Sequence, residues 1–92
     1  RRLELKDNFP NPFNPSTTLR FSLSDEDYVR LTIHDISGRI VRTLIDNTRT
    51  AGTQQVVWDG RDSRNAAVAT GLYFVRVETS SDVQTQKIAL IK

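Results

Sequence analysis

Hydrophobic and polar residues alternate along much of this chain, with the period of two that is typical of β-strands. The clearest patterns lie at 17–23, 28–35 and 71–79, and shorter ones at 53–59 and 83–91 predict two further strands. No segment carries an apolar stripe of helical period and length, so the pattern predicts an all-β fold. The predicted core faces contain Leu19, Phe21, Leu23, Val29, Leu31, Ile33, Trp58, Tyr73, Val75, Val77, Ile88 and Leu90.

Two segments have patterns that leave their structure open. The apolar residues of 40–45 do not alternate, which is compatible with a β-bulge, with a strand covered on both faces, or with a short helix. Residues 46–52 are mostly polar and are predicted to form a loop. Near the start, residues 3–6 alternate over too short a stretch to distinguish an edge strand from a linker.

Turn residues separate these segments at the short spacing found in β-sandwiches. Gly38 follows Asp35 and Ser37, whose side chains can bond the backbone of a tight turn, and Asp59-Gly60 is a second turn signal. The sequence therefore predicts an all-β fold, an Ig-like or fibronectin-III-like antiparallel β-sandwich of about seven strands. Residues 8–92 are expected to form one domain, with 1–7 as a linker or short edge strand from a preceding domain.

A proline-rich segment precedes the first clear strand and contains every proline of the chain. It reads Asn-Phe-Pro-Asn-Pro-Phe-Asn-Pro over residues 8–15, and it can be neither a helix nor a central strand. Phe9 and Phe13 supply two large apolar rings within it. We expect the segment to cap one end of the sandwich, with both rings packed against core residues such as Trp58 or Tyr73.

Length, charge and composition narrow the function classes. The chain has 92 residues, no cysteine and a net charge of +2, and its basic residues are scattered along the sequence. One domain without disulfides is therefore expected, and nucleic-acid binding, which favours clustered basic residues, is not. The apolar runs are far shorter than the roughly 20 residues of a transmembrane helix. Because the chain opens on Arg1 rather than on Met, we expect it to be one end of a longer protein.

Candidate chemistry is sparse, and neither an enzymatic activity nor a cofactor is predicted. His34, the only histidine, lies on the polar face of a predicted strand without the surroundings of a nucleophile elbow. Asp59 and Asp62 are candidate calcium ligands, but the intervening arginine and the missing terminal glutamate argue against an EF-hand loop. Tyr28 and Phe74 are predicted to face outward, where aromatic rings could bind carbohydrate.

The order of the motifs is more specific than any one of them. The proline segment is followed by Asp-Ile-Ser-Gly-Arg at 35–39, Trp-Asp-Gly at 58–60, Gly-Leu-Tyr at 71–73 and a lysine-flanked apolar strand at 87–92. This series resembles the C-terminal sorting domain (type A) of type IX secretion substrates, which is related to the Ig-like domain of flagellar hook-capping proteins. The residues that carry the resemblance as a structural signature are Asn11, Pro12, Phe13, Asn14, Pro15, Gly38, Trp58 and Gly60.

The resemblance implies a non-catalytic module at the end of a larger bacterial protein. Its partners would be the outer-membrane secretion machinery and the upstream passenger domain, and its destination the cell surface by way of the periplasm. The positions implied in recognition are Gly71, Tyr73, Lys87 and Lys92. The last strand could pair edge-to-edge with a strand of a receptor. The alternatives are an Ig-like spacer or assembly domain of a surface or hook-cap protein, and a carbohydrate-binding module.

Overall fold

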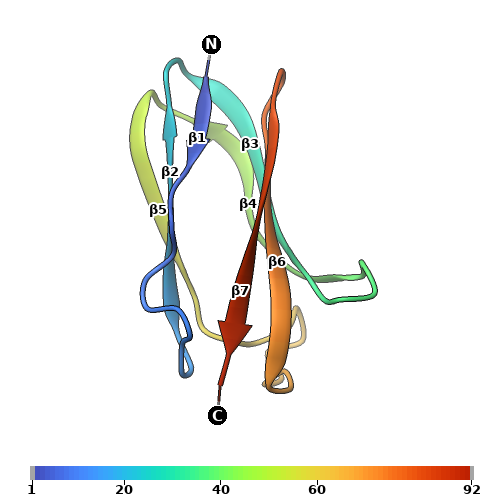
Figure 1. The fold of residues 1–92 in the computed structure, drawn as a ribbon. Coiled ribbons are helices and arrows are strands. Elements are labelled where there is room, and N and C mark those ends of the chain that lie inside the picture. Colours follow the sequence, from blue (N-terminus) through green and yellow to red (C-terminus); the bar gives the residue numbers. More distant parts are fainter. Residues whose placement is uncertain (1, 92) are drawn as a thin grey trace.

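Two antiparallel β-sheets packed face to face make up the domain (Figure 1). The computed structural model describes residues 2–91. One sheet has the strand order β1-β2-β5 and the other β4-β3-β6-β7, which confirms the predicted Ig-like sandwich. The strands are β1 Leu3–Leu5, β2 Thr17–Leu23, β3 Asp27–His34, β4 Ile40–Arg49, β5 Gly52–Trp58, β6 Gly71–Glu78 and β7 Val83–Leu90.

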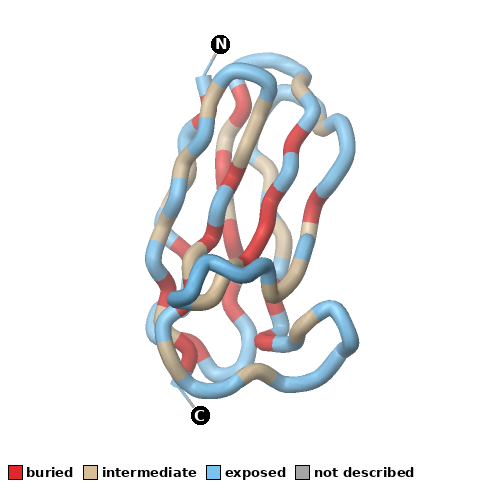
Figure 2. Tube along the Cα trace, turned by 90° about the vertical axis from the view of Figure 1, so that its right-hand side faces the viewer, coloured by how far each residue is buried: buried red, intermediate tan, exposed pale blue. Residues whose placement is uncertain are grey.

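The core lies between the sheets and follows the alternation of the sequence. Buried and exposed residues alternate along the strands, as the red and pale segments in Figure 2 show. Trp58 is fully buried at 0% exposure, in the place predicted for the largest apolar side chain. All of the predicted core residues are buried, together with Leu3, Phe13 and Ile45.

Strand β4 is longer and less regular than the sequence pattern indicates. Residues 46–49 were expected in a loop, but they pair with β3, with Asp27 opposite Arg49. Their polar side chains suit this part of the edge strand, because residues 46–48 are exposed on both faces. The register shifts at two places, between Leu31 and Thr32 and between Ile33 and His34. These shifts explain why the apolar residues of β4 do not alternate, and the short-helix alternative is wrong.

The N-terminal segment begins in one sheet and ends at the other. β1 pairs with β2, placing Leu3 opposite Leu23, so residues 3–5 form the edge strand of the first sheet. Further along, Phe9 forms a bridge with Thr18 of β2, and Phe13 forms a parallel bridge with Leu90 of β7. Residues 8–15, which we call the strap, therefore cross from the edge of one sheet to the edge of the other, a way in which sandwiches close a corner.

Phe9 is not a core residue, contrary to the prediction. Its side chain is 72% exposed, whereas that of Phe13 is 1% exposed. The backbone of Phe9 exchanges hydrogen bonds of 3.0 and 2.8 Å with Thr18. Residues paired in this way point to the same face of a sheet, and Thr18 lies on the outer face between the inward Thr17 and Leu19. The pairing therefore turns the Phe9 ring outward.

Candidate functional site

The strap, the Trp-Asp-Gly turn and the end of β7 meet at one end of the sandwich, the lower end in Figure 1. The amide of Phe13 donates to the Ala89 carbonyl at 3.0 Å, and the amide of Ile91 donates to the Phe13 carbonyl at 2.9 Å. The side-chain oxygen of Asn11 accepts from the Ala89 amide at 3.1 Å. The strap and the C-terminal end of β7 are thus joined by three hydrogen bonds.

A row of three aromatic rings runs inward from this junction. Phe13 and Trp58 have ring centroids 5.6 Å apart, and Trp58 meets Tyr73 edge-on at 5.4 Å. The Trp58 indole donates to the Arg61 carbonyl at 2.9 Å, and the Tyr73 hydroxyl donates to the Ala69 carbonyl at 2.6 Å. Burial raises the pKa of Tyr73, and the Asp35 carboxylate raises it further, so this hydroxyl stays a donor. The row places Tyr73 of the Gly-x-Tyr motif in the core.

Gly60 holds the Trp-Asp-Gly turn against the strap. Its φ is +74°, and a Cβ at this position would stand 2.9 Å from the Pro15 carbonyl oxygen. Only glycine combines this backbone angle with such a close approach. In the strap, Pro12, Asn14 and Pro15 are exposed. Phe13 is therefore the buried residue of the segment 11–15.

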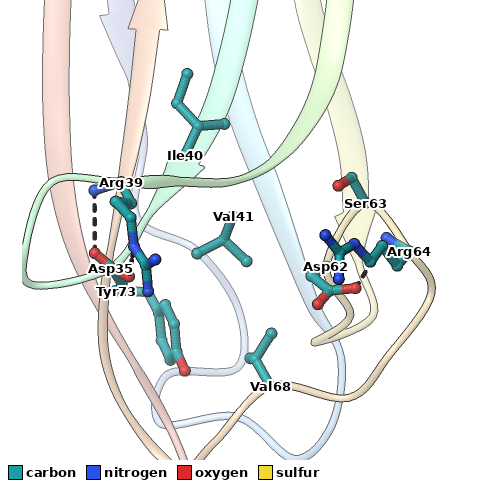
Figure 3. Close-up of a pocket in the computed structure, with 9 residues that line it drawn as sticks. All are labelled: Asp35, Arg39, Ile40, Val41, Asp62, Ser63, Arg64, Val68 and Tyr73. Carbon is teal, nitrogen blue, oxygen red and sulfur yellow. Dashed lines mark hydrogen bonds and ion pairs between the residues drawn. The ribbon is translucent and has the colours of Figure 1, made fainter.

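A hollow of about 480 Å³ opens beside Tyr73 (Figure 3). The turn of 35–39 forms one wall: Asp35 accepts from the Ser37 hydroxyl at 2.6 Å and the Arg39 amide at 3.1 Å, and it pairs with the Arg39 guanidinium at 3.6 Å. The hydrogen bond from Ser37 is the main cause that lowers the pKa of Asp35. The hollow is lined by Asp35, Arg39, Ile40, Val41, Asp62, Ser63, Arg64, Val68 and Tyr73.

The candidate calcium ligands are both engaged in turns. Asp59 accepts from the Arg61 amide at 3.1 Å and lies 3.5 Å from the Arg42 guanidinium. Asp62 accepts from the amides of Arg64 and Ala66 at 2.9 and 3.0 Å. The Ala66 hydrogen bond is the main cause that lowers the pKa of Asp62. Within residues 2–91, no three acidic, histidine or cysteine side chains gather in a metal-binding cluster.

The residues implied in recognition are only partly brought together. Gly71 pairs with Leu90 and Tyr73 with Ile88, so both lie near the strap. Lys87 pairs with Phe74 and is exposed near the middle of β7. Lys92 lies outside the described residues. The structure therefore joins Gly71 and Tyr73 to the strap through β7 and leaves Lys87 on the open surface.

The outward aromatic residues do not share a platform. Phe74 pairs with His34 at one end of β3, whereas Tyr28 lies near the other end. At the usual rise per residue of a strand, His34 and Tyr28 are roughly 20 Å apart. The Tyr28 hydroxyl donates to Asp46, and this hydrogen bond is the main cause that raises the pKa of Tyr28. His34 contacts the Thr32 hydroxyl at 2.8 Å and the Gly38 carbonyl at 3.2 Å, which are structural contacts of the turn.

Gln84 joins the two sheets, a role that its local sequence pattern did not predict. Its amide group donates to the Leu3 carbonyl at 2.7 Å and accepts from the Leu5 amide at 2.8 Å. It thereby links β7 of one sheet to β1 of the other. The available signal was its position in the predicted last strand, because Gln84 alternates onto the same face as the buried Ile88 and Leu90.

No helix among residues 2–91 has the length and apolar character needed to cross a membrane.

Comparison with known proteins gives a family match and a related sequence, both from a flagellar protein. The model of the FlgD Ig-like domain family matches residues 13–82, well over half of the chain. The basal-body rod modification protein FlgD of Salmonella typhimurium is 38% identical over 63 residues, covering 68% of this chain and 27% of FlgD. The chain thus spans about a quarter of the curated relative that it matches.

Two solved structures share the fold over nearly the whole chain. Dimeric latent PorU of Porphyromonas gingivalis superposes with a TM-score of 0.75 and 19% identity, over 97% of this chain and 9% of PorU. PorZ of the same organism, an essential surface component of the type IX secretion system, gives 0.66 and 24% identity, over 96% of this chain and 11% of PorZ.

The sequence match and the fold agree on the type of module. The matched family is one of non-catalytic Ig-like domains, and the two-sheet order found here is that of an Ig-like sandwich. The chain therefore belongs to the FlgD Ig-like domain family.

Proposed function

We propose that this domain is a C-terminal sorting module of a larger exported bacterial protein. It carries no reaction of its own. The outer-membrane secretion machinery recognises it after passage into the periplasm, and the passenger that precedes it is delivered to the cell surface. Gly71, Tyr73, Lys87 and Lys92 belong to the recognition elements in this proposal.

The observation that carries the proposal is that the strap and the C-terminal end of β7 are hydrogen-bonded to each other. The strap is hydrogen-bonded to Ala89 and Ile91, and Gly71 and Tyr73 pair with the same strand. Three elements of the motif set that resembles type IX sorting domains, the proline segment, the Trp-Asp-Gly turn and Gly-x-Tyr, therefore lie together at one end of the sandwich, while Lys87 lies outside this end. The likeness to PorZ and PorU supports the proposal, since it covers nearly all of this chain but about a tenth of theirs, as expected for a module within a larger protein.

A reporter fusion tests this function directly. We expect a fluorescent protein placed before residues 1–92 to reach the cell surface in a bacterium that has type IX machinery. In the same strain without that machinery, the fusion should stay in the periplasm. Periplasmic retention of the folded fusion in the competent strain would contradict the sorting role.

A second candidate function is an Ig-like spacer or assembly domain of a surface or hook-cap protein. The observation in its favour is the 38% identity to Salmonella FlgD, which is the strongest sequence match reported above. A spacer transmits no export signal, so the fusion would be retained in the competent strain. Purified domain would then be tested for association with hook protein, which the sorting proposal does not require.

A further inference from the structure

Strand β7 presents a row of backbone groups away from β6. Paired residues in an antiparallel ladder alternate between positions that exchange hydrogen bonds and positions that do not. Ala89 directs its amide to Asn11 and its carbonyl to Phe13. Ala89 and its partner Leu72 therefore do not exchange backbone hydrogen bonds with each other. By the same alternation, the backbone groups of Val83, Thr85 and Lys87 also point outward, along the edge of the sheet.

The strap occupies only the C-terminal half of this row. It satisfies both groups of Ala89 and the amide of Ile91. Within residues 2–91, the outward groups of Thr85 and Lys87 have no hydrogen-bond partner, and at Val83 the amide is bonded to the Asp82 side chain at 2.9 Å. Five groups stay open: the carbonyl of Val83 and both groups of Thr85 and Lys87.

The facing edge of β1 is partly occupied, in contrast. The Leu5 amide and the Leu3 carbonyl are both bonded to the Gln84 side chain, as described above. An extended segment arriving at this side of the sandwich therefore finds a longer run of open donors and acceptors on β7, because the Gln84 side chain blocks the short edge of β1. An unpaired strand edge of this kind is a template for an added strand.

The side chains beside the open groups favour an acidic partner segment. Thr85 and Lys87 are exposed on the outer face, where Arg76 is paired with Thr85. The Arg76 side chain is 44% exposed and already pairs with Glu78 at 3.6 Å, whereas Lys87 has no ion pair within residues 2–91. Lys87 disfavours two copies of β7 in registers that bring the two lysines together, since like charges repel. A carboxylate on an added strand would instead meet Lys87.

We propose that a partner protein adds a short, extended, acidic segment to β7 over residues 83–87. This segment would bond to the backbone groups of β7 that the strap leaves open. This inference rests on the proposed sorting function and specifies the surface through which the module is recognised. The strap sets the limit of that surface, because Asn11 and Phe13 already hold the groups beyond Lys87.

Proline at position 85 tests the added strand with little change to the sheet itself. Thr85→Pro removes an outward amide that β6 does not use, and edge positions tolerate proline for this reason. Gln55→Pro is the matched control, on the edge of β5. Thr18 directs its backbone groups to Phe9, so its partner Val57 does not bond to β2. By the alternation of the ladder, the amide of Gln55 also points outward from β5. Lys87→Glu is a second variant, which reverses the charge of an exposed side chain without touching the backbone.

The assay is surface export of the reporter fusion, with the melting temperature of each purified variant measured alongside. Export of the Thr85→Pro fusion should fall roughly tenfold or more. The variant cannot donate the hydrogen bond from residue 85 to the added strand, and the proline ring blocks the approach of that strand. Lys87→Glu should also reduce export, and Gln55→Pro should not. If Thr85→Pro fails to fold, Lys87→Glu decides alone.

Three outcomes would overturn the inference. Export of Thr85→Pro and Lys87→Glu at the level of Gln55→Pro would exclude the β7 edge while leaving the sorting function intact. A concentration-dependent dimer that Thr85→Pro abolishes, seen by analytical ultracentrifugation, would assign the edge to a second copy. Absence of export for the unmodified fusion is a failure of the sorting function itself, and it removes the partner that the inference requires.

Discussion

Gly60 and Pro15 approach each other so closely that the strap and the Trp-Asp-Gly turn form one unit. A Cβ on Gly60 would stand 2.9 Å from the Pro15 carbonyl oxygen, closer than side-chain carbons come to backbone oxygens. On the other side of this turn, the Gly60 carbonyl accepts from the Val68 amide at 3.0 Å. The turn is therefore held between the strap on one side and the loop of Val68 on the other.

Gly60→Ala is expected to destabilise the domain by roughly 2–4 kcal/mol, from the positive φ and the clash together. Gly38→Ala is the control, since Gly38 has a φ of +90° but nothing within 4 Å of an added Cβ. It should cost only about 1 kcal/mol, the backbone contribution alone. Urea denaturation of both variants checks the difference, and equal losses would show that the contact with Pro15 is unimportant.

Phe13→Ala should lower the free energy of unfolding by roughly 3–5 kcal/mol, because it opens a cavity beside Trp58. Phe9→Ala is the matched substitution in the same strap, and we expect a change within about 0.5 kcal/mol for its exposed ring. Thermal and chemical denaturation give both values. Similar losses for the two variants would contradict the outward orientation of Phe9.

Removal of the Gln84 side chain should loosen the contact between the sheets. Gln84→Ala leaves the Leu5 amide and the Leu3 carbonyl without their partner, at a cost of roughly 1–3 kcal/mol. Gln86→Ala is the control, because Gln86 donates one hydrogen bond of 3.2 Å to the exposed Asp7 side chain. Hydrogen exchange at the Leu5 amide should accelerate in the first variant only. Unchanged protection there would contradict the bridge.

Stability should fall in acid partly through Asp35 and Asp62, whose pKa values are lowered in the folded state. A lowered pKa means that the unfolded chain binds protons more readily, so this stabilisation is present above about pH 4 and is lost as the pH falls through the folded value. Asp62→Asn removes one titrating group and should flatten the decline of unfolding free energy below pH 4. Parallel pH profiles of the variant and the parent would contradict this account.

Much of the fold could be read from the sequence because strand alternation is a local property. The inward faces of β2, β3 and β6 follow directly from residues two apart, and the sandwich follows from burying those faces together. Turn chemistry at Gly38 was equally local, since Asp35 bonds the backbone of its own turn. Trp58 could be placed in the core from its size alone.

Only the tertiary structure decided what happens at the edges of the sheets. The orientation of Phe9 depends on its bridge to Thr18, and the strand character of 46–49 depends on its pairing with β3. The union of the strap with β7 joins residues near opposite ends of the chain, as Phe13 with Leu90. Such pairings leave no mark on the local pattern, because any unpaired strand edge offers the same backbone groups. Alternation along the sequence therefore determined the faces of the sandwich, and long-range pairing decided which edges are closed and which part of β7 stays open.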